Sequence, residues 1–176
     1  MLVPLYLDAA GGLHAVFTKR RDYLKRHPGE ISFPGGRRDD GDVDLTETAL
    51  REAHEEIGLS REHVEVVGAL QPTPTFVTNY SIYPFVGIID PGHVWELQAA
   101  EVAHVLELRL DDVRAGYARR RLVRRGIPFR TDSYCVGEQL IWGATARIVA
   151  DLLERVEALP WDDRPCRATR PSRPAR

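Results

Sequence analysis

The amino-acid sequence predicts a single α/β domain, and three observations carry this prediction. The chain has 176 residues, a length that suits one domain with a sizeable buried core. Short β-favouring runs bounded by Gly and Pro recur along it, beginning at residues 2–7. Two amphipathic patterns with helical spacing lie far apart, at 45–57 and 136–158. Residues 160–176 are rich in Arg and Pro, so we expect the domain to span 1–159 and a disordered tail to follow.

Composition excludes several other classes of protein. The chain carries Lys+Arg 24 against Asp+Glu 26, a net charge of -2, so no overall basic field favours nucleic acid as a partner. No apolar run reaches the ~18 residues of a membrane-spanning helix, and the first residues lack the basic segment of a signal peptide. The two cysteines, Cys135 and Cys166, are too far apart in the sequence to suggest a disulfide framework. We therefore expect a cytoplasmic protein with no membrane partner.

The first elements are a strand pair and a basic segment. Residues 2–7 and 13–18 favour β structure and are separated by a Gly-rich turn. The basic segment 19–30 follows and leads into the sequence Phe33-Pro34-Gly35-Gly36. Two interpretations of this segment are open: a solvated loop, or a clamp for the phosphate groups of an anionic substrate.

Residues 45–57 have the start, the apolar face and the end of a helix. Asp44 suits the N-cap, and Glu47 stands three residues later, which is the pattern of a capping box. Gly58 occupies the position where a left-handed residue ends a helix. The residues of the predicted buried stripe are Leu45, Ala49, Ala53 and Ile57.

The other face of this helix is acidic. Glu52, Glu55 and Glu56 have the spacing that brings side chains to one patch of a helix. Their mutual repulsion falls if a hard divalent cation such as Mg²⁺ or Mn²⁺ binds among them. Arg51 can hold one carboxylate, and the Gly35-Gly36 turn allows backbone to approach closely. The alternative is a solvated acidic face, but the nearby Gly-Gly turn favours a site for metal and phosphate.

The second half of the chain predicts further strands at 64–70, 80–89 and 102–110, and then a short helix at 110–113. Residues 114–130 contain seven arginines around a turn at Gly126. Three interpretations of that segment are open: a grip for nucleotide phosphates, an exposed hairpin with charged edges, or an RNA-binding surface. The exposed hairpin is slightly favoured.

Residues 36–59 resemble the signature of the Nudix hydrolases. The second half of the signature matches position by position, from Arg51 to Leu59. The first half departs from it, because the position of the usual glutamate falls on Val43. One extra loop residue, with Asp42 or Asp39 in the role of that acid, restores the pattern.

The segment before the signature resembles the coenzyme A diphosphatase branch of this superfamily. The resemblance rests on Phe33-Pro34-Gly35-Gly36 and on the preceding Thr18, Arg20, Leu24, His27 and Gly29. Two positions differ, because Arg21 replaces a serine and Lys25 replaces an arginine of the branch. The resemblance implies a Nudix-type α/β/α sandwich in which a mixed, curled sheet lies between two helices.

The resemblance also implies an activity, a metal-dependent hydrolysis of a diphosphate linkage in a nucleotide derivative. Coenzyme A or acyl-CoA is the first candidate substrate, and ADP-ribose, a dinucleotide or a nucleoside triphosphate is the alternative. A non-catalytic module that senses a nucleotide is a third hypothesis. A homodimer is also left open.

The roles of individual residues follow from the same resemblance. Mg²⁺ or Mn²⁺ is expected on Glu52, Glu55, Glu56 and the carbonyl of Gly36. Arg51 is expected to orient the acids. The proton of the attacking water is expected to pass to Glu55 or to Glu101, which stands just before the strand at 102–110. The basic residues expected to contact the substrate are Arg20, Lys25 and Arg26. The aromatic character of Phe76 and Tyr80 suits stacking on an adenine or lining a channel for the substrate, with packing in the core as the alternative.

Overall fold

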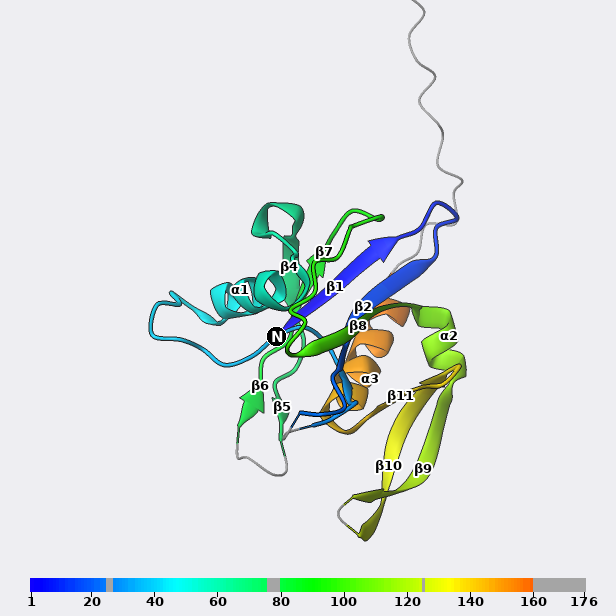
Figure 1. Ribbon diagram of the computed structural model, residues 1–176. Coiled ribbons are helices and arrows are strands. Elements are labelled where there is room, and N and C mark those ends of the chain that lie inside the picture. Colours follow the sequence, from blue (N-terminus) through cyan, green and yellow to red (C-terminus); the bar gives the residue numbers. More distant parts are fainter. Residues whose placement is uncertain (25–26, 76–79, 125, 160–176) are drawn as a thin grey trace, which may run out of the picture.

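Two helices cover opposite faces of a mixed sheet, as the sequence predicts. The computed structural model describes residues 1–24, 27–75, 80–124 and 126–159. Helix α1 (Leu45–Ile57) lies on one face of the sheet and helix α3 (Gly143–Glu157) on the other (Figure 1). The strands of this sheet are β1 (Leu2–Leu7), β2 (Leu13–Arg20), β3 (Ile31–Ser32), β4 (Glu65–Ala69), β7 (Phe85–Ile88) and β8 (Val102–Arg109).

The order of the strands makes the sheet mixed. The sequence β3-β2-β1-β7-β4 runs across it, and β8 pairs with β2. The pair β1–β7 is parallel and the other pairs are antiparallel. Strands β5 (Thr73–Pro74) and β6 (Ser81–Ile82) form a separate small ribbon, and a short 3₁₀ helix spans Arg61–His63. The predicted α/β class and the mixed sheet are therefore confirmed.

Side-chain alternation along β1 divides the interior into two cores. Val3 and Leu5 pack in the core beneath α3, whereas Leu2 and Tyr6 pack in the core beneath α1. Successive residues of a strand point to opposite faces of the sheet, so a fully apolar strand such as β1 can serve both helices. This arrangement places α1, which carries the acidic residues Glu52, Glu55 and Glu56, on one face of the sheet.

The boundaries of α1 agree with the local signals in the sequence. The Asp44 carboxylate accepts a hydrogen bond from the Glu47 amide at 2.8 Å, which satisfies one free amide of the first turn. Gly58 ends the helix with φ 72°, a left-handed conformation that glycine adopts without a steric penalty. A stable helix with fixed ends is the platform for the candidate site.

The predicted helix at 136–158 is wrong in its first part. Val136 ends strand β10, and the next strand, β11 (Gln139–Trp142), returns antiparallel to it. Gly137, with φ 57°, provides the tight turn between the two strands. The short apolar run Leu140-Ile141-Trp142 is compatible with a strand as well as with a helix. The sequence therefore did not show where α3 begins.

The predicted strand at 80–89 is also divided. Residues 81–82 belong to β6, whereas β7 starts at Phe85. Pro84 lies between them, and a proline has no amide hydrogen to donate to a neighbouring strand. Its carbonyl still accepts a hydrogen bond from the Leu70 amide at 2.9 Å.

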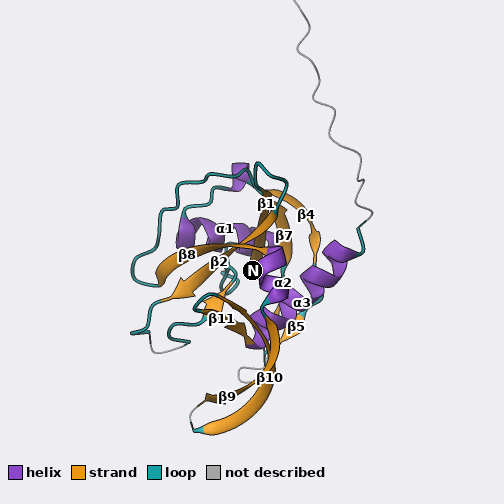
Figure 2. Cartoon of the chain, turned by 90° about the vertical axis from the view of Figure 1, so that its right-hand side faces the viewer, coloured by secondary structure: helices purple, strands orange, loops and turns teal. Residues whose placement is uncertain are grey.

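The arginine-rich segment forms a hairpin. After the short helix α2 (Leu110–Ala115), strands β9 (Tyr117–Arg124) and β10 (Ile127–Val136) pair antiparallel, and with β11 they form a second sheet. The hairpin extends away from the rest of the domain in two perpendicular views (Figures 1 and 2). In the described part of the chain no helix is both long and apolar enough to cross a membrane. The predicted tail at 160–176 lies outside the described residues.

Replacing Phe17 by Ala tests the packing of this core. Phe17 is fully buried, and its ring stacks on that of Phe33 with centroids 4.4 Å apart. We expect a loss of about 3–5 kcal/mol in the free energy of unfolding, measured by chemical denaturation. Val94→Ala is the control, because Val94 is 90% exposed and the change should stay within about 0.5 kcal/mol. Equal losses in both variants would contradict the assignment of Phe17 to the core.

Candidate active site

The glycine turn and the acidic face of α1 meet directly. A Cβ atom on Gly36 would overlap the carboxylate of Glu52, so any larger residue at this position would displace that carboxylate. The amide of Gly35 donates a hydrogen bond to Glu56 Oε2 at 3.1 Å. The structure thus brings the predicted metal ligands Gly36, Glu52 and Glu56 together at one point.

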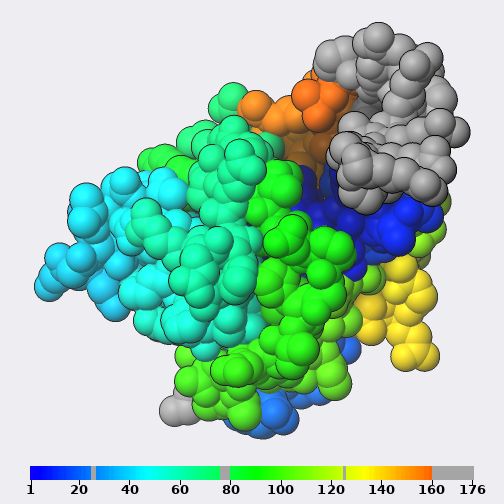
Figure 3. All heavy atoms as spheres, turned by 90° about the horizontal axis from the view of Figure 1, so that it is seen from above, coloured from blue at the N-terminus to red at the C-terminus, as the bar shows by residue number. Residues whose placement is uncertain are grey.

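Arg51 connects the loop before α1 to the helix. Its Nε and Nη2 atoms donate to the two carboxylate oxygens of Asp42 at 2.9 and 3.1 Å, a two-point contact of the kind that fixes geometry. Asp42 also accepts hydrogen bonds from the Thr48 hydroxyl at 2.8 Å and from the Asp39 amide at 2.9 Å. The loop itself stands out from the body of the domain (Figure 3).

The environments of Asp42 and Asp39 differ, although the sequence offered both as the acid that replaces the usual glutamate of the signature. The Asp42 side chain is only 6% exposed, whereas that of Asp39 is 74% exposed and lies 3.8 Å from Arg51. Arg51 holds the pKa of Asp42 well below its usual range, and the Asp39 amide acts in the same direction. Of the two candidates, Asp42 is therefore the carboxylate that is buried and bound to Arg51.

Arg51 also holds two of the glutamates. Its Nη1 donates to Glu55 Oε2 at 3.0 Å and its Nη2 to Glu52 Oε1 at 3.2 Å. The carbonyl of Arg37 accepts from Nη2 as well, at 3.0 Å. Glu55 stays 55% exposed and lies on the outer side of this network. The three glutamates therefore differ in environment, although they share one face of the helix.

Burial disfavours the ionised forms of the two inner acids. Glu56 is 7% exposed, and burial raises its pKa to about 7, although the hydrogen bond from the Gly35 amide opposes this change. Burial also raises the pKa of Glu52, against the opposing charge of Arg51. A positive charge close to both carboxylates would favour their ionised forms.

Glu101 and Arg20 lie beside this pair. Arg20 is the last residue of β2, and Glu101 directly precedes β8. The Nη2 atom of Arg20 lies 3.6 Å from Glu101 Oε2. The charge of Arg20 lowers the pKa of Glu56, and that of Glu101 raises it. The Nε atom of Arg20 is buried and has no hydrogen-bond partner within the described ranges. Such an unsatisfied donor suits an anionic ligand.

The protein ligands at this site suit magnesium, which also takes ligands from water and substrate. In the part of the chain that is described, no three Asp, Glu, His or Cys side chains approach closely enough to hold an ion by themselves. Magnesium is commonly bound by one or two carboxylates together with substrate phosphates and water. The two inner acids, Glu52 and Glu56, with the backbone at Gly36, fit that requirement.

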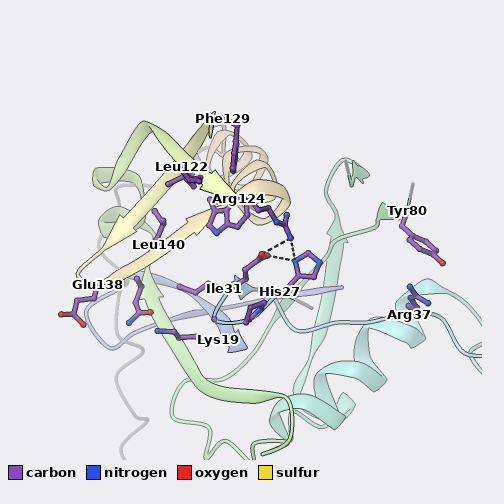
Figure 4. A pocket seen from close by; sticks show the side chains of 16 residues that line it. Lys19, His27, Ile31, Arg37, Tyr80, Leu122, Arg124, Phe129, Glu138 and Leu140 are labelled. Carbon is purple, nitrogen blue, oxygen red and sulfur yellow. Dashed lines mark hydrogen bonds and ion pairs between the residues drawn. The ribbon is translucent and has the colours of Figure 1, made fainter. Parts of the chain in front are cut away.

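A cleft of about 900 Å³ borders the site (Figure 4). Tyr80, a predicted contact for the substrate, lies on its rim, and the Arg37 guanidinium stacks over the Tyr80 ring at 4.8 Å. The sequence reasoning missed Arg37, although its position directly after Gly36 was a signal. The predicted contacts Lys25, Arg26 and Phe76 lie outside the described residues.

Known proteins of one family resemble this chain. The NUDIX domain family matches residues 3–125. A protein of Enterobacter sp. (strain 638) called Nudix hydrolase NudL is 36% identical over 162 residues, which cover 91% of this chain and 83% of that protein. The chain therefore belongs to the Nudix hydrolase family.

Solved structures share the fold at low sequence identity. The Nudix hydrolase RenU from M. smegmatis superposes with a TM-score of 0.65 at 16% identity and covers 93% of this chain and 87% of its own. The Nudix domain of Shewanella oneidensis NrtR, solved in complex with ADP ribose, gives a TM-score of 0.56 at 15% identity and covers 88% and 84%. At this identity the likeness supports the fold alone.

The Arg51–Asp42 contact predicts a dependence of stability on pH. The pKa of Asp42 is lower in the folded than in the unfolded chain, so its charge stabilises the fold above its ordinary pKa of about 3.9. We expect Asp42→Asn to lower the melting temperature at pH 7. The difference in melting temperature between this variant and the wild type should become smaller as the pH falls below about 4, towards the lowered pKa of Asp42.

Asp39→Asn is the matched control for this experiment, because Asp39 belongs to the same loop but is largely exposed. Its melting temperature should stay close to that of the wild type across the same pH range. A gap for Asp42→Asn that does not change with pH would contradict the prediction.

Proposed function

We propose that this protein is a metal-dependent hydrolase that cleaves a diphosphate linkage in a nucleotide derivative, with coenzyme A or acyl-CoA as the first candidate substrate. The observation that carries the proposal is the contact of the glycine turn with the half-buried Glu52 and the buried Glu56. Two acids that lose solvation, next to backbone and to the unsatisfied Nε of Arg20, suit a cation and a phosphate together.

Glu52, Glu56 and the Gly36 carbonyl would hold Mg²⁺ or Mn²⁺. When bound, such an ion polarises the phosphorus of the substrate and lowers the pKa of a coordinated water. Arg51 holds Glu52 in place and, through the Arg37 carbonyl and Asp42, also holds the loop. Arg20 offers a donor that would offset charge on the phosphate oxygens.

Of the two candidates for the general base, we propose Glu101 rather than Glu55 as the acceptor of the proton of the attacking water. The carboxylate of Glu55 is already held by Arg51 at 3.0 Å on the exposed side of the helix. Glu101 is about as exposed, but its contact with an arginine is longer, 3.6 Å from Arg20 Nη2, and its charge acts on the buried Glu56. Glu101 is therefore the first candidate for the general base, and Glu55 suits a supporting role.

ADP-ribose is the second candidate substrate. The solved Nudix domain of Shewanella oneidensis NrtR contains this ligand, and ADP-ribose carries the same diphosphate linkage between two larger groups. A purely nucleotide-sensing module is less favoured, because all three acids of the signature are present and two of them, Glu52 and Glu56, contact the glycine turn.

Glu52→Gln and Glu56→Gln test the proposed metal site. Each change removes a charged ligand, and we expect kcat to fall by at least about a hundredfold in Mg²⁺ or Mn²⁺. Circular dichroism should show an intact fold, because neither side chain forms part of the apolar core. Glu62→Gln is the control, with an exposed glutamate outside the site and an unchanged rate. Near-normal rates in both site variants would refute the mechanism.

A substrate panel tests the proposed specificity. Purified protein is incubated with Mg²⁺ or Mn²⁺ and with coenzyme A, ADP-ribose, a dinucleotide and a nucleoside triphosphate, and the products are identified by mass. We expect coenzyme A to yield adenosine 3′,5′-bisphosphate and a phosphopantetheine. Cleavage of ADP-ribose with no cleavage of coenzyme A would replace the first candidate with the second.

A further inference from the structure

The cleft beside the active site has two walls from distant parts of the chain. One wall consists of the hairpin and β11, including Arg124, Phe129 and Trp142, and the other of the segment around His27 and Glu30 (Figure 4). Its volume of about 900 Å³ is large enough for a sizeable part of a nucleotide derivative. Nothing in the Nudix signature accounts for these residues.

Arg124 is oriented in the cleft by two contacts. Its guanidinium stacks on the Trp142 ring at 5.3 Å, and Phe129 supports that ring with centroids 5.8 Å apart. Its Nη2 atom lies 3.4 Å from Glu30 Oε1. A guanidinium that is already oriented loses little conformational freedom when it binds an anion.

The cleft carries more positive than negative charge. The permanent cations along it are Lys19, Arg37 and Arg124, whereas the acids are Glu30 and Glu138. Glu138 lies at the far end and points outward in Figure 4. Glu30 is shared, because it also accepts from His27 at 2.7 Å. Within the described ranges, neither Lys19 nor Arg37 has a carboxylate within 4.0 Å, so the central part of the cleft suits an anion.

Arg37 links the cleft to the proposed metal site. Arg37 directly follows Gly36, its carbonyl accepts a hydrogen bond from Arg51, and its side chain lines the cleft beside Tyr80. A substrate whose diphosphate lies at Gly36 would therefore extend past Arg37 into the cleft. Gln139 also lines the cleft, and its Oε1 atom is buried with no donor in the described part of the chain. This acceptor suits an amino or hydroxyl group of a ligand.

We propose that this cleft binds the half of the substrate that carries a phosphate monoester, and that Arg124 recognises this phosphate. The inference rests on the proposed function and goes further, because it selects nucleotides with a phosphate beyond the diphosphate that is cleaved. In coenzyme A that group is the 3′-phosphate. Arg124 is a specificity residue in this scheme and takes no part in the chemical step.

Binding without metal tests the inference independently of catalysis. Calorimetry compares adenosine 3′,5′-bisphosphate with adenosine 5′-monophosphate, which lacks the second phosphate. We expect the wild type to bind the bisphosphate at least about tenfold more tightly, as one charge-assisted hydrogen-bonded contact provides. Arg124→Gln should lose this preference and leave the affinity for the monophosphate unchanged.

Two further variants guard against misfolding. Arg119→Gln changes an exposed arginine of the same strand that does not line the cleft, so it should keep the preference. Glu30→Gln removes the carboxylate that partly neutralises Arg124. It should strengthen binding of the bisphosphate and have a smaller effect on the monophosphate. No change in the preference in either Arg124→Gln or Glu30→Gln would overturn the inference.

Kinetics separates this inference from the proposed function. The ratio of kcat/KM for coenzyme A to that for 3′-dephospho-coenzyme A should fall in Arg124→Gln and stay constant in Arg119→Gln. An active enzyme whose ratio does not respond to Arg124→Gln would contradict the inference and leave the hydrolase intact. Inactivity on coenzyme A, with bisphosphate binding that depends on Arg124, would contradict the substrate and support the phosphate site.

Discussion

The two-point contact between Arg51 and Asp42 is the interaction on which the site depends. It joins the loop before α1 to the helix, and the same guanidinium contacts Glu52 and the Arg37 carbonyl. Because one side chain fixes both the acids and the backbone opposite them, the spacing between them is set by packing and not by the ligand.

Burial gives the two inner acids a chemistry that exposed glutamates lack. Glu56 lies beneath the glycine turn, and its charge is opposed by desolvation and by the neighbouring acids Glu52 and Glu101. A protein of ordinary stability tolerates such a group only where the surroundings hold it in place. Because a nearby positive charge would offset the cost of ionising Glu56, binding of a divalent ion at this position is favourable.

Much of the site could be predicted because its signals are local. The cap, the apolar stripe and the terminal glycine define α1, and they place the glutamates on one face before any tertiary contact is known. The choice of Asp42 over Asp39 depends on which carboxylate is buried, and no local pattern contains that information. The start of α3 was missed because a short apolar run fits a strand and a helix equally well. Arg124 and Glu30 are far apart in the sequence and meet only in the folded chain, so the cleft could not be predicted from either segment alone.

The hairpin belongs to a three-stranded sheet of its own, apart from the sheet that supports α1. Substitutions in β9 or β10 can therefore reshape one wall of the cleft while the carboxylates keep their positions. Related proteins could then come to prefer different ligands by changing a few side chains of the hairpin, while the hydrolytic centre stays the same. A chimaera that carries a hairpin from another relative should inherit the donor's selectivity together with the recipient's chemistry.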